Sequence, residues 1–208
     1  MKTDQTSLEQ LKNKLKQLSS TSATDLQANP DFNAFRSQQL MPLQIAAVLI
    51  PLIILNNQAH LLLIKRPLHM PSHPGDLAFP GGKPEPTDST LQDTAIRETQ
   101  EELGIERSRI EPLGALPDYI SLSGFRIRPY LGWITSPEPL TPSADEVAAV
   151  YLPTLDYMMN SANYQLQSRQ HEGQQRHFYQ IPVEQEVCWG ATAGILHHLA
   201  NQYTHLPS

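Results

Sequence analysis

The chain is poor in the features that mark secreted and membrane proteins. Its 208 residues include one cysteine, Cys188, so no disulfide can form within the chain, which fits a reducing compartment. The longest apolar run, Ile45 to Leu55, contains Pro51 and is too short to cross a bilayer. The first residues lack the apolar core of a signal peptide. We therefore expect a cytoplasmic protein that does not enter a membrane.

Positive charge is also scarce. Lysine and arginine number 15 against 21 aspartates and glutamates, which gives a net charge of −6. Nonspecific nucleic-acid binding requires a basic surface, so we expect no nucleic-acid partner. A small phosphorylated substrate stays possible, because only the field at its own site matters.

Acidic side chains gather in one stretch, residues 79–105, where a Pro/Gly-rich loop precedes a helix expected from Leu91 to Leu103 and ended by Gly104. Glu98, Glu101 and Glu102 fall within a sector about 100° wide on that helix. Like charges at this spacing cost a few tenths of a kcal/mol per pair unless a cation offsets them. Mg²⁺ or Mn²⁺, bound through oxygen, is the candidate, and a solvated acidic face is the alternative.

The stretch resembles the Nudix box, G-x5-E-x7-R-E-U-x-E-E-x-G-U, where U is aliphatic. The matching positions are Gly82, Arg97, Glu98, Glu101, Glu102, Gly104 and Ile105. Two positions depart from it. Asp88 takes the first acidic position, one residue further from the arginine than in the pattern, and Thr99 takes the aliphatic position.

The resemblance implies an α+β protein, an α/β/α sandwich with a mixed β-sheet between helices, that hydrolyses a diphosphate linked to another moiety. It assigns Glu98, Glu101 and Glu102 to the metal and gives Arg97 the role of orienting glutamates through salt bridges. The alternative for Arg97 is an exposed surface side chain. The general base is open: Glu146 is the first candidate and Asp145 the second, and Glu101 or Glu102 could act as both ligand and base.

The loop before the helix has its own expected roles. Gly81 and Gly82 let the backbone approach the phosphate or the metal without a Cβ. Asp88 either helps to fix the loop, as the resemblance implies, or forms an Asx turn or helix cap.

Residues upstream of the box resemble the signature of coenzyme A pyrophosphatases, L-L-T-x-R-[SA]-x3-R-x3-G-x3-F-P-G-G. The matching positions are Leu62, Leu63, Arg66, Gly75, Phe79, Pro80, Gly81 and Gly82. The implied reaction cleaves coenzyme A, or a derivative, to 3′,5′-ADP and 4′-phosphopantetheine. The signature's second arginine is Pro71 here, and its Ser/Ala position is Pro67, so another cation must replace the arginine or the specificity differs.

Two other functions remain open. One is an ADP-ribose or dinucleotide pyrophosphatase, and the other is a catalytically silent Nudix domain that senses a nucleotide. A substrate with a second phosphate needs cationic side chains. Arg66 is the first choice, and the further candidates, each also readable as an ordinary surface charge, are Lys65, Lys83, Arg126 and Arg128.

The remaining segments predict the organisation of the chain. Leucines at helical spacing predict a helix over residues 7–18 that docks on the domain or on a second copy in a homodimer. With a linker it forms an N-terminal part, 1–39, ahead of a Nudix domain over 40–208. Further predicted elements are a hairpin (46–55 with 60–65), a short strand near 77–79, strands at 110–117, 126–135 and 146–151, a helical turn at 155–160, paired strands (164–167 with 177–182) and a last helix from Val187 to Gln202.

Overall fold

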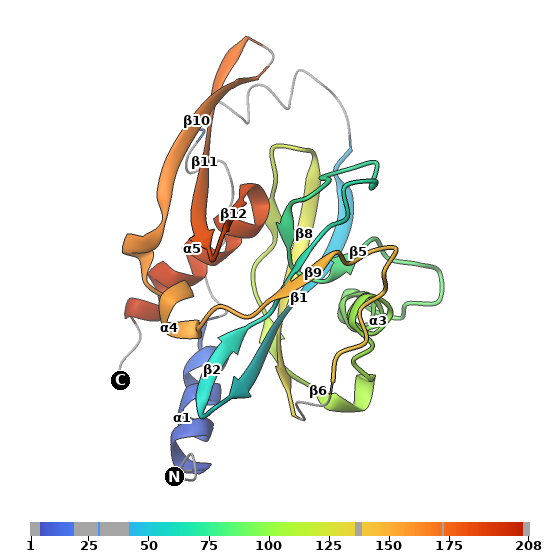
Figure 1. The fold of residues 1–208 in the computed structure, drawn as a ribbon, viewed down its shortest axis with the longest axis vertical. Helices are drawn as coiled ribbons and strands as arrows, with labels where there is room; N and C mark the ends of the chain where they lie inside the picture. The colour runs from blue at the N-terminus through green and yellow to red at the C-terminus, as the bar shows by residue number, and fades with distance from the viewer. Residues whose placement is uncertain (1–4, 19–28, 30–41, 136–138, 172, 206–208) are drawn as a thin grey trace.

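A mixed β-sheet forms the centre of the computed structural model (Figure 1), which describes residues 5–18, 29, 42–135, 139–171 and 173–205. Its main path runs β2-β1-β8-β6, with β5 paired to β1 and β7 paired to β8. The strands are β1 (Gln44–Leu55), β2 (Gln58–Leu61), β5 (Gly81–Gly82), β6 (Ile110–Ala115), β7 (Tyr119–Ile120) and β8 (Phe125–Ile134). Only the β1–β8 pair is parallel among these described pairs. The sheet is therefore mixed, as predicted.

The β1–β2 hairpin turns at Asn56 and Asn57, whose φ angles are 49° and 64°. Positive φ at both central residues is what a type I′ hairpin turn requires, and asparagine tolerates it. The predicted second strand, 60–65, proves to be two strands. Beyond Leu61, β3 (Leu63–Lys65) leaves the central sheet and pairs with β4 (Leu77–Ala78) and β9 (Ala149–Tyr151). The prediction of a single hairpin that pairs residues 46–55 with 60–65 was therefore wrong.

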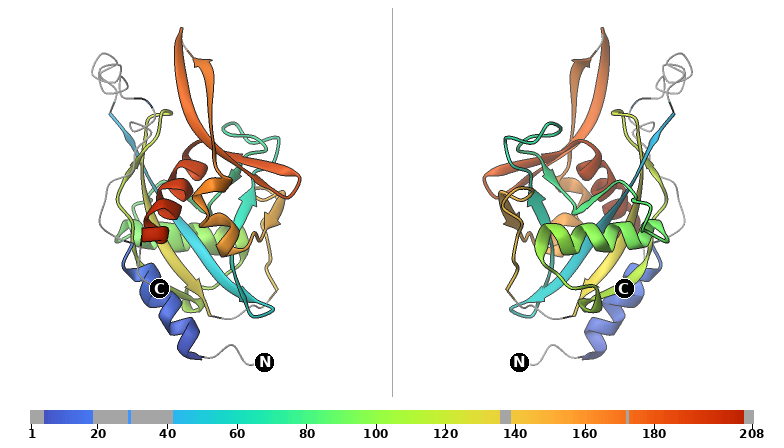
Figure 2. Two further views of the ribbon diagram at one scale, coloured as in Figure 1. Left: turned by 90° about the vertical axis from the view of Figure 1, so that its left-hand side faces the viewer. Right: turned by 90° about the vertical axis from the view of Figure 1, so that its right-hand side faces the viewer.

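Helices cover both faces of the central sheet. Along β1, Ala47, Leu49 and Ile53 belong to the core under α3 (Leu91–Leu103). The intervening Ile50 and Leu52 belong to the core shared with α5 (Gly190–His205). Because successive side chains of a strand point to opposite faces, an unbroken apolar run is what a strand covered on both faces requires. Figure 2 shows α3 and α5 on opposite faces, which confirms the α/β/α layering.

Helix α3 has the predicted bounds because both of its ends are capped. The Thr90 side chain accepts a hydrogen bond from the amide of Asp93, and Gly104 ends the helix with φ of 67°. Ala95, Thr99 and Leu103 are buried against the sheet. Burial of that face turns the glutamate face toward the loop that carries β5.

The C-terminal region adds a three-stranded antiparallel sheet, β10 (Gln165–His171), β11 (Gln174–Val183) and β12 (Glu186–Trp189), packed beside α5. The predicted strand pair is present and longer than expected. The predicted helix start at Val187 was wrong, because Val187 and Cys188 pair with Pro182 and Ile181 of β11. The helix begins at Gly190.

The N-terminal helix, α1 (Gln5–Lys16), packs on the domain of its own chain. Leu15 is buried in the same core as Trp133, and Lys12 Nζ lies 2.6 Å from Glu111 Oε2 of β6. The predicted linker and the domain start near Leu40 lie outside the described residues, apart from Asn29 and from residue 42 onward. The division of the chain at residue 40 and the homodimer both stay predictions.

The short elements complete the described chain: α4 (Leu155–Met158) and two single-turn 3-10 helices, Arg107–Arg109 and Ser161–Asn163. Within the described residues, every helix is too short or too polar to reach across a bilayer.

Candidate active site

Arg97 is the hub that ties the loop before α3 to the helix. Its Nε and Nη2 donate hydrogen bonds to the two oxygens of Asp88, both at 3.1 Å. Asp88 Oδ2 also accepts from Thr94 Oγ1 and from the amide of Glu85, each at 2.9 Å. These donors, the guanidinium first, lower the pKa of Asp88 to about 2. Asp88 therefore fixes the loop, and it does not cap α3, which is the role of Thr90.

The same guanidinium holds two of the helix glutamates. Arg97 Nη1 lies 2.8 Å from Glu101 Oε2, and Nη2 lies 3.0 Å from Glu98 Oε1. Nη2 also donates to the carbonyl oxygen of Lys83 at 3.2 Å. A planar guanidinium can serve several acceptors at once, so one side chain sets the orientation of two carboxylates and the loop.

Burial affects two glutamates of α3, of which Glu102 is buried and Glu98 is partly buried. Glu102 is 4% exposed, and burial raises its pKa to about 8, although the amide of Gly81 donates to its Oε2 at 3.1 Å. Burial also raises the pKa of Glu98. The negative charge of Glu146 acts in the same direction on both. Glu98, Glu102 and Glu146 therefore form one acidic cluster, and a bound cation would stabilise it.

Both glycines of the loop are required by close approaches. A Cβ at Gly82 would lie 2.3 Å from Glu98 Oε1. A Cβ at Gly81 would lie 2.4 Å from the carbonyl oxygen of Ala47, on β1. Without side chains, the loop backbone packs closely on β1 and on Glu98, while its predicted approach to a phosphate or metal stays a prediction.

Glu101 lies apart from the acidic cluster. Its side chain is 53% exposed and is turned toward Arg97. In the part of the chain that the structure describes, no three acidic, histidine or cysteine side chains already form a metal cage. The donor set still suits a hard divalent cation, because Glu102 offers a buried carboxyl group, Glu98 offers a partly buried one and Glu101 adjoins Glu102 on the helix.

A cavity of about 550 Å³ opens beside the acidic cluster, and seven of the predicted site residues line it. These are Arg66, Gly81, Gly82, Lys83, Glu98, Glu102 and Glu146. Arg97 and Glu101 are not among the residues that line the cavity. Asp145, the second candidate base, is exposed and does not line the cavity, which favours Glu146.

The five candidate cations divide into two groups. Arg66 and Lys83 line the cavity. The others are held by carboxylates elsewhere: Lys65 Nζ lies 2.5 Å from Glu186 Oε1, while Arg126 and Arg128 both pair with Asp118.

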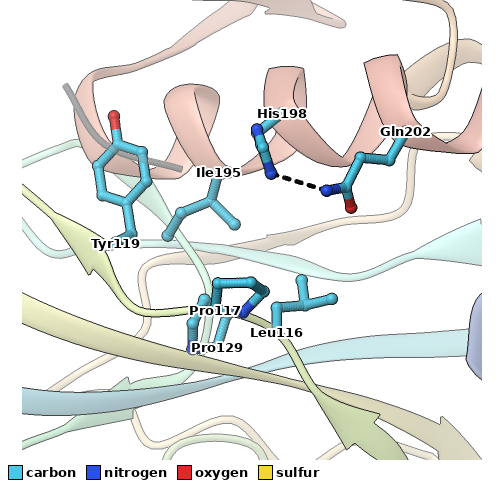
Figure 3. Close-up of a pocket in the computed structure, with 7 residues that line it drawn as sticks. All are labelled: Leu116, Pro117, Tyr119, Pro129, Ile195, His198 and Gln202. Atoms are coloured by element: carbon cyan, nitrogen blue, oxygen red, sulfur yellow. Dashed lines mark hydrogen bonds between the residues drawn. The ribbon is translucent and has the colours of Figure 1, made fainter. Parts of the chain in front are cut away.

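The cavity also has a wall that sequence reasoning missed. Arg169 and Arg176 of the β10–β11 hairpin line it, together with Phe178 and Trp189. The two arginines lie far from the box in the sequence, and their position in two polar strands gave no sign that they line a cavity. A second hollow, between α5 and the strand region of Leu116 and Pro129 (Figure 3), has a volume of about 10 Å³ and is too small for a substrate.

Comparison with known proteins decides the family. The NUDIX domain family matches residues 45–176, most of the chain. The chain belongs to the Nudix family. The uncharacterized Nudix hydrolase NudL of Pectobacterium atrosepticum is 37% identical over 162 residues, 78% of this chain and 84% of the relative. NudL of Escherichia coli O7:K1 is 38% identical over 157 residues, 76% of this chain and 81% of the relative.

Solved Nudix structures confirm the fold. The Nudix hydrolase RenU of M. smegmatis superposes with a TM-score of 0.54 at 16% identity, covering 81% of this chain and 91% of that one. The MutT protein of Methanosarcina mazei Go1 gives 0.50 at 16% identity, covering 80% and 99%. The protein is thus a Nudix pyrophosphohydrolase, a class that acts on nucleoside diphosphate derivatives and generally needs divalent metal ions.

Proposed function

We propose that this Nudix hydrolase cleaves the diphosphate of coenzyme A or its derivatives, releasing 3′,5′-ADP and 4′-phosphopantetheine. The observation that supports this most is the shared cavity. Arg66, Phe79, Gly81 and Gly82, which belong to the resemblance to coenzyme A pyrophosphatases, line the same cavity as Glu98 and Glu102. The part of the sequence that suggests the substrate therefore adjoins the part that suggests the chemistry.

The side chains divide the work of the reaction. Glu98, Glu101 and Glu102 would hold Mg²⁺ or Mn²⁺, which supplies positive charge beside the phosphoryl oxygens. Arg97 orients Glu98 and Glu101 through the ion pairs described above. Glu146, which lines the cavity, would accept a proton from the attacking water.

Binding of the diphosphate falls to the two predicted cations. Arg66 stays in place because its Nε donates to the carbonyl oxygen of Ser72 at 3.3 Å. Lys83 Nζ lies 5.7 Å from the centre of the Phe125 ring, close enough for a cation–π contact. Both can neutralise phosphate oxygens that the metal does not reach.

Pro71 is the residue that argues against coenzyme A as the substrate. Its neighbours Met70 and Ser72 line the cavity, but a proline offers no charge at the position where the signature has an arginine. An ADP-ribose or dinucleotide pyrophosphatase is the alternative, since such substrates lack the extra phosphate of coenzyme A. A silent sensor fits less well, because a binder without chemistry has no use for three glutamates within one sector of α3.

Product analysis tests the proposal. The purified protein is incubated with coenzyme A and, separately, with ADP-ribose, in Mg²⁺, in Mn²⁺ and in EDTA, and the products are separated by chromatography. We expect 3′,5′-ADP from coenzyme A with either metal and none in EDTA. Faster turnover of ADP-ribose than of coenzyme A would overturn the proposed substrate, and tight nucleotide binding without turnover would favour the sensor.

A further inference from the structure

One wall of the cavity carries two arginines directly opposite each other on neighbouring strands. Arg169 of β10 pairs in register with Arg176 of β11, and Phe178 follows two residues later on the same face. Trp189 of β12 pairs with Gln180, the next residue of that face. The two guanidinium groups and the two rings therefore share the side of the C-terminal sheet that faces the cavity.

This arrangement has an electrostatic cost. Like charges directly opposite on an antiparallel pair are destabilising, and Arg176, which is only 3% exposed, donates a hydrogen bond to the neutral side chain of Gln174. Among the described residues, no carboxylate forms an ion pair with Arg169. Its Cζ lies instead 5.0 Å from the centre of the Trp189 ring and 5.8 Å from that of Phe178. The rings hold the guanidinium in place without neutralising it.

The aromatic support is itself anchored. Trp189 Nε1 donates to Asp76 Oδ1 at 3.0 Å, and Asp76 belongs to the loop that follows Arg66. Phe178 meets Trp189 edge to face, with ring centres 5.7 Å apart. Arg169 is therefore ordered before any ligand arrives, which reduces the entropy lost on binding.

The arginine wall is separate from the acidic cluster. Figure 1 shows the β10–β11 hairpin and α3 on opposite sides of β1 and β8, and the cavity is lined by both. The acidic cluster suits a cation and the diphosphate that the cation bridges. An anion at the hairpin must then be a different group of the same substrate.

We propose that Arg169 and Arg176 bind a phosphomonoester on the ribose of the substrate, distinct from the diphosphate that is cleaved. The inference rests on the proposed function for the orientation of the substrate, and it supplies the cation that Pro71 does not provide. Arginine is suited to the role because its guanidinium can donate two parallel hydrogen bonds to a phosphate.

The direct test is calorimetric binding of three nucleotides without metal: adenosine 3′,5′-bisphosphate, adenosine 2′,5′-bisphosphate and 5′-AMP. One of the bisphosphates is expected to bind about tenfold or more tightly than 5′-AMP, the gain typical of an added charged hydrogen bond. The bisphosphate that gains shows whether the 3′ or the 2′ position is read. Equal binding of all three overturns the proposal.

Substitutions of the two arginines test whether they cause the preference for a bisphosphate. Arg169→Ala and Arg176→Gln are each expected to abolish the preference, and thermal unfolding shows whether the buried Arg176 variant still folds. The exposed Arg169 variant keeps the test decisive if it does not. Arg126→Ala removes one positive charge from β8 outside the cavity and should retain the preference. A preference that survives Arg169→Ala overturns the proposal.

Hydrolysis separates this inference from the proposed function. Coenzyme A and 3′-dephospho-coenzyme A are compared for kcat/KM in the wild type and in Arg169→Ala. If the arginines bind the nucleotides but coenzyme A is not hydrolysed, the phosphate subsite is supported and the proposed function is overturned. If coenzyme A and 3′-dephospho-coenzyme A are hydrolysed with equal kcat/KM, the proposed function is supported and a subsite for the 3′-phosphate is overturned.

Discussion

Arg97 and Asp88 form a two-pronged ion pair, in which Nε and Nη2 each donate to a different carboxylate oxygen at 3.1 Å. The side chain of Asp88 is 5% exposed, so the pair is shielded from competing water. The extra residue between Asp88 and Arg97, relative to the Nudix pattern, does not prevent this contact. The loop and α3 are thereby fixed to each other before a metal or substrate binds.

Acid should weaken the ion pair between Arg97 and Asp88. The pKa of Asp88 in the folded protein, about 2, lies below its ordinary value of 3.8, so its ionised form stabilises the fold above pH 3.8. That contribution is lost as the pH falls through about 2. We expect the Tm difference between wild type and Asp88→Asn to be largest near neutral pH and to shrink toward pH 2. Circular dichroism melts measure it, and a difference independent of pH contradicts the ion pair.

Glu101 is expected to matter for catalysis even though it lies outside the cavity wall. Glu101→Gln should lower kcat by about 100-fold, the scale seen when a key electrostatic group is removed. Steady-state kinetics at saturating Mg²⁺ tests this, with Gln100→Ala, an exposed neighbour on α3, as the matched control. A near-normal rate would remove Glu101 from the metal site and leave it a partner of Arg97.

Glu102 is expected to show a conflict between stability and function. A glutamine there keeps an oxygen for the Gly81 amide and removes one buried negative charge from the acidic cluster. At pH 9 in EDTA, above the raised pKa of about 8, Glu102 is ionised in the wild type, so Glu102→Gln should unfold about 3 °C higher, or about 1 kcal/mol for a chain of this size. The same variant should lose activity. A lower Tm in EDTA would show that the ionised carboxylate is stabilised by its surroundings.

Substituting alanine for Gly81 or for Gly82 should change different properties of the protein. In Gly82→Ala the new Cβ meets the end of the Glu98 side chain, which can move, so we expect a folded protein with reduced kcat. In Gly81→Ala it meets the backbone of β1, which cannot move, so we expect a loss of stability of about 1–3 kcal/mol. Chemical denaturation and kinetics on both variants separate the outcomes. Equal effects on stability would contradict this distinction.

The N-terminal helix offers a test of its role. Leu15 is buried in the core of its own chain, so Leu15→Ala should cost about 2–4 kcal/mol without changing the molar mass measured by light scattering. Leu68, which is exposed, is the control for substitution of a leucine. A change of mass with little change of stability would place the helix at a dimer interface.

The sequence predicted the parts of the site that are close together in the chain. The bounds of α3 were predicted because helical periodicity and the ending glycine, Gly104, are local signals, whereas its cap at Thr90 was not predicted. The same holds for the loop with Gly81 and Gly82. The split of residues 60–65 between two sheets was missed because strand pairing depends on distant partners, here β9.

The arginine wall was missed for the same physical reason. Arg169 and Arg176 become neighbours through the β10–β11 register, and both line the cavity. Neither residue lies near a recognisable motif. The start of α5 was misplaced because Val187 and Cys188 are apolar and continue the helical pattern, whereas their backbone pairs with β11.

The hydrogen bond from Trp189 to Asp76 joins residues 113 positions apart in the chain. During synthesis on the ribosome, the loop, α3 and its carboxylates emerge well before the arginine wall exists. A nascent chain thus has α3 available early, while the cavity is completed only when the last strands arrive. Contacts of such long range form slowly in folding. Substrate selectivity should accordingly be the last property this protein acquires as it folds.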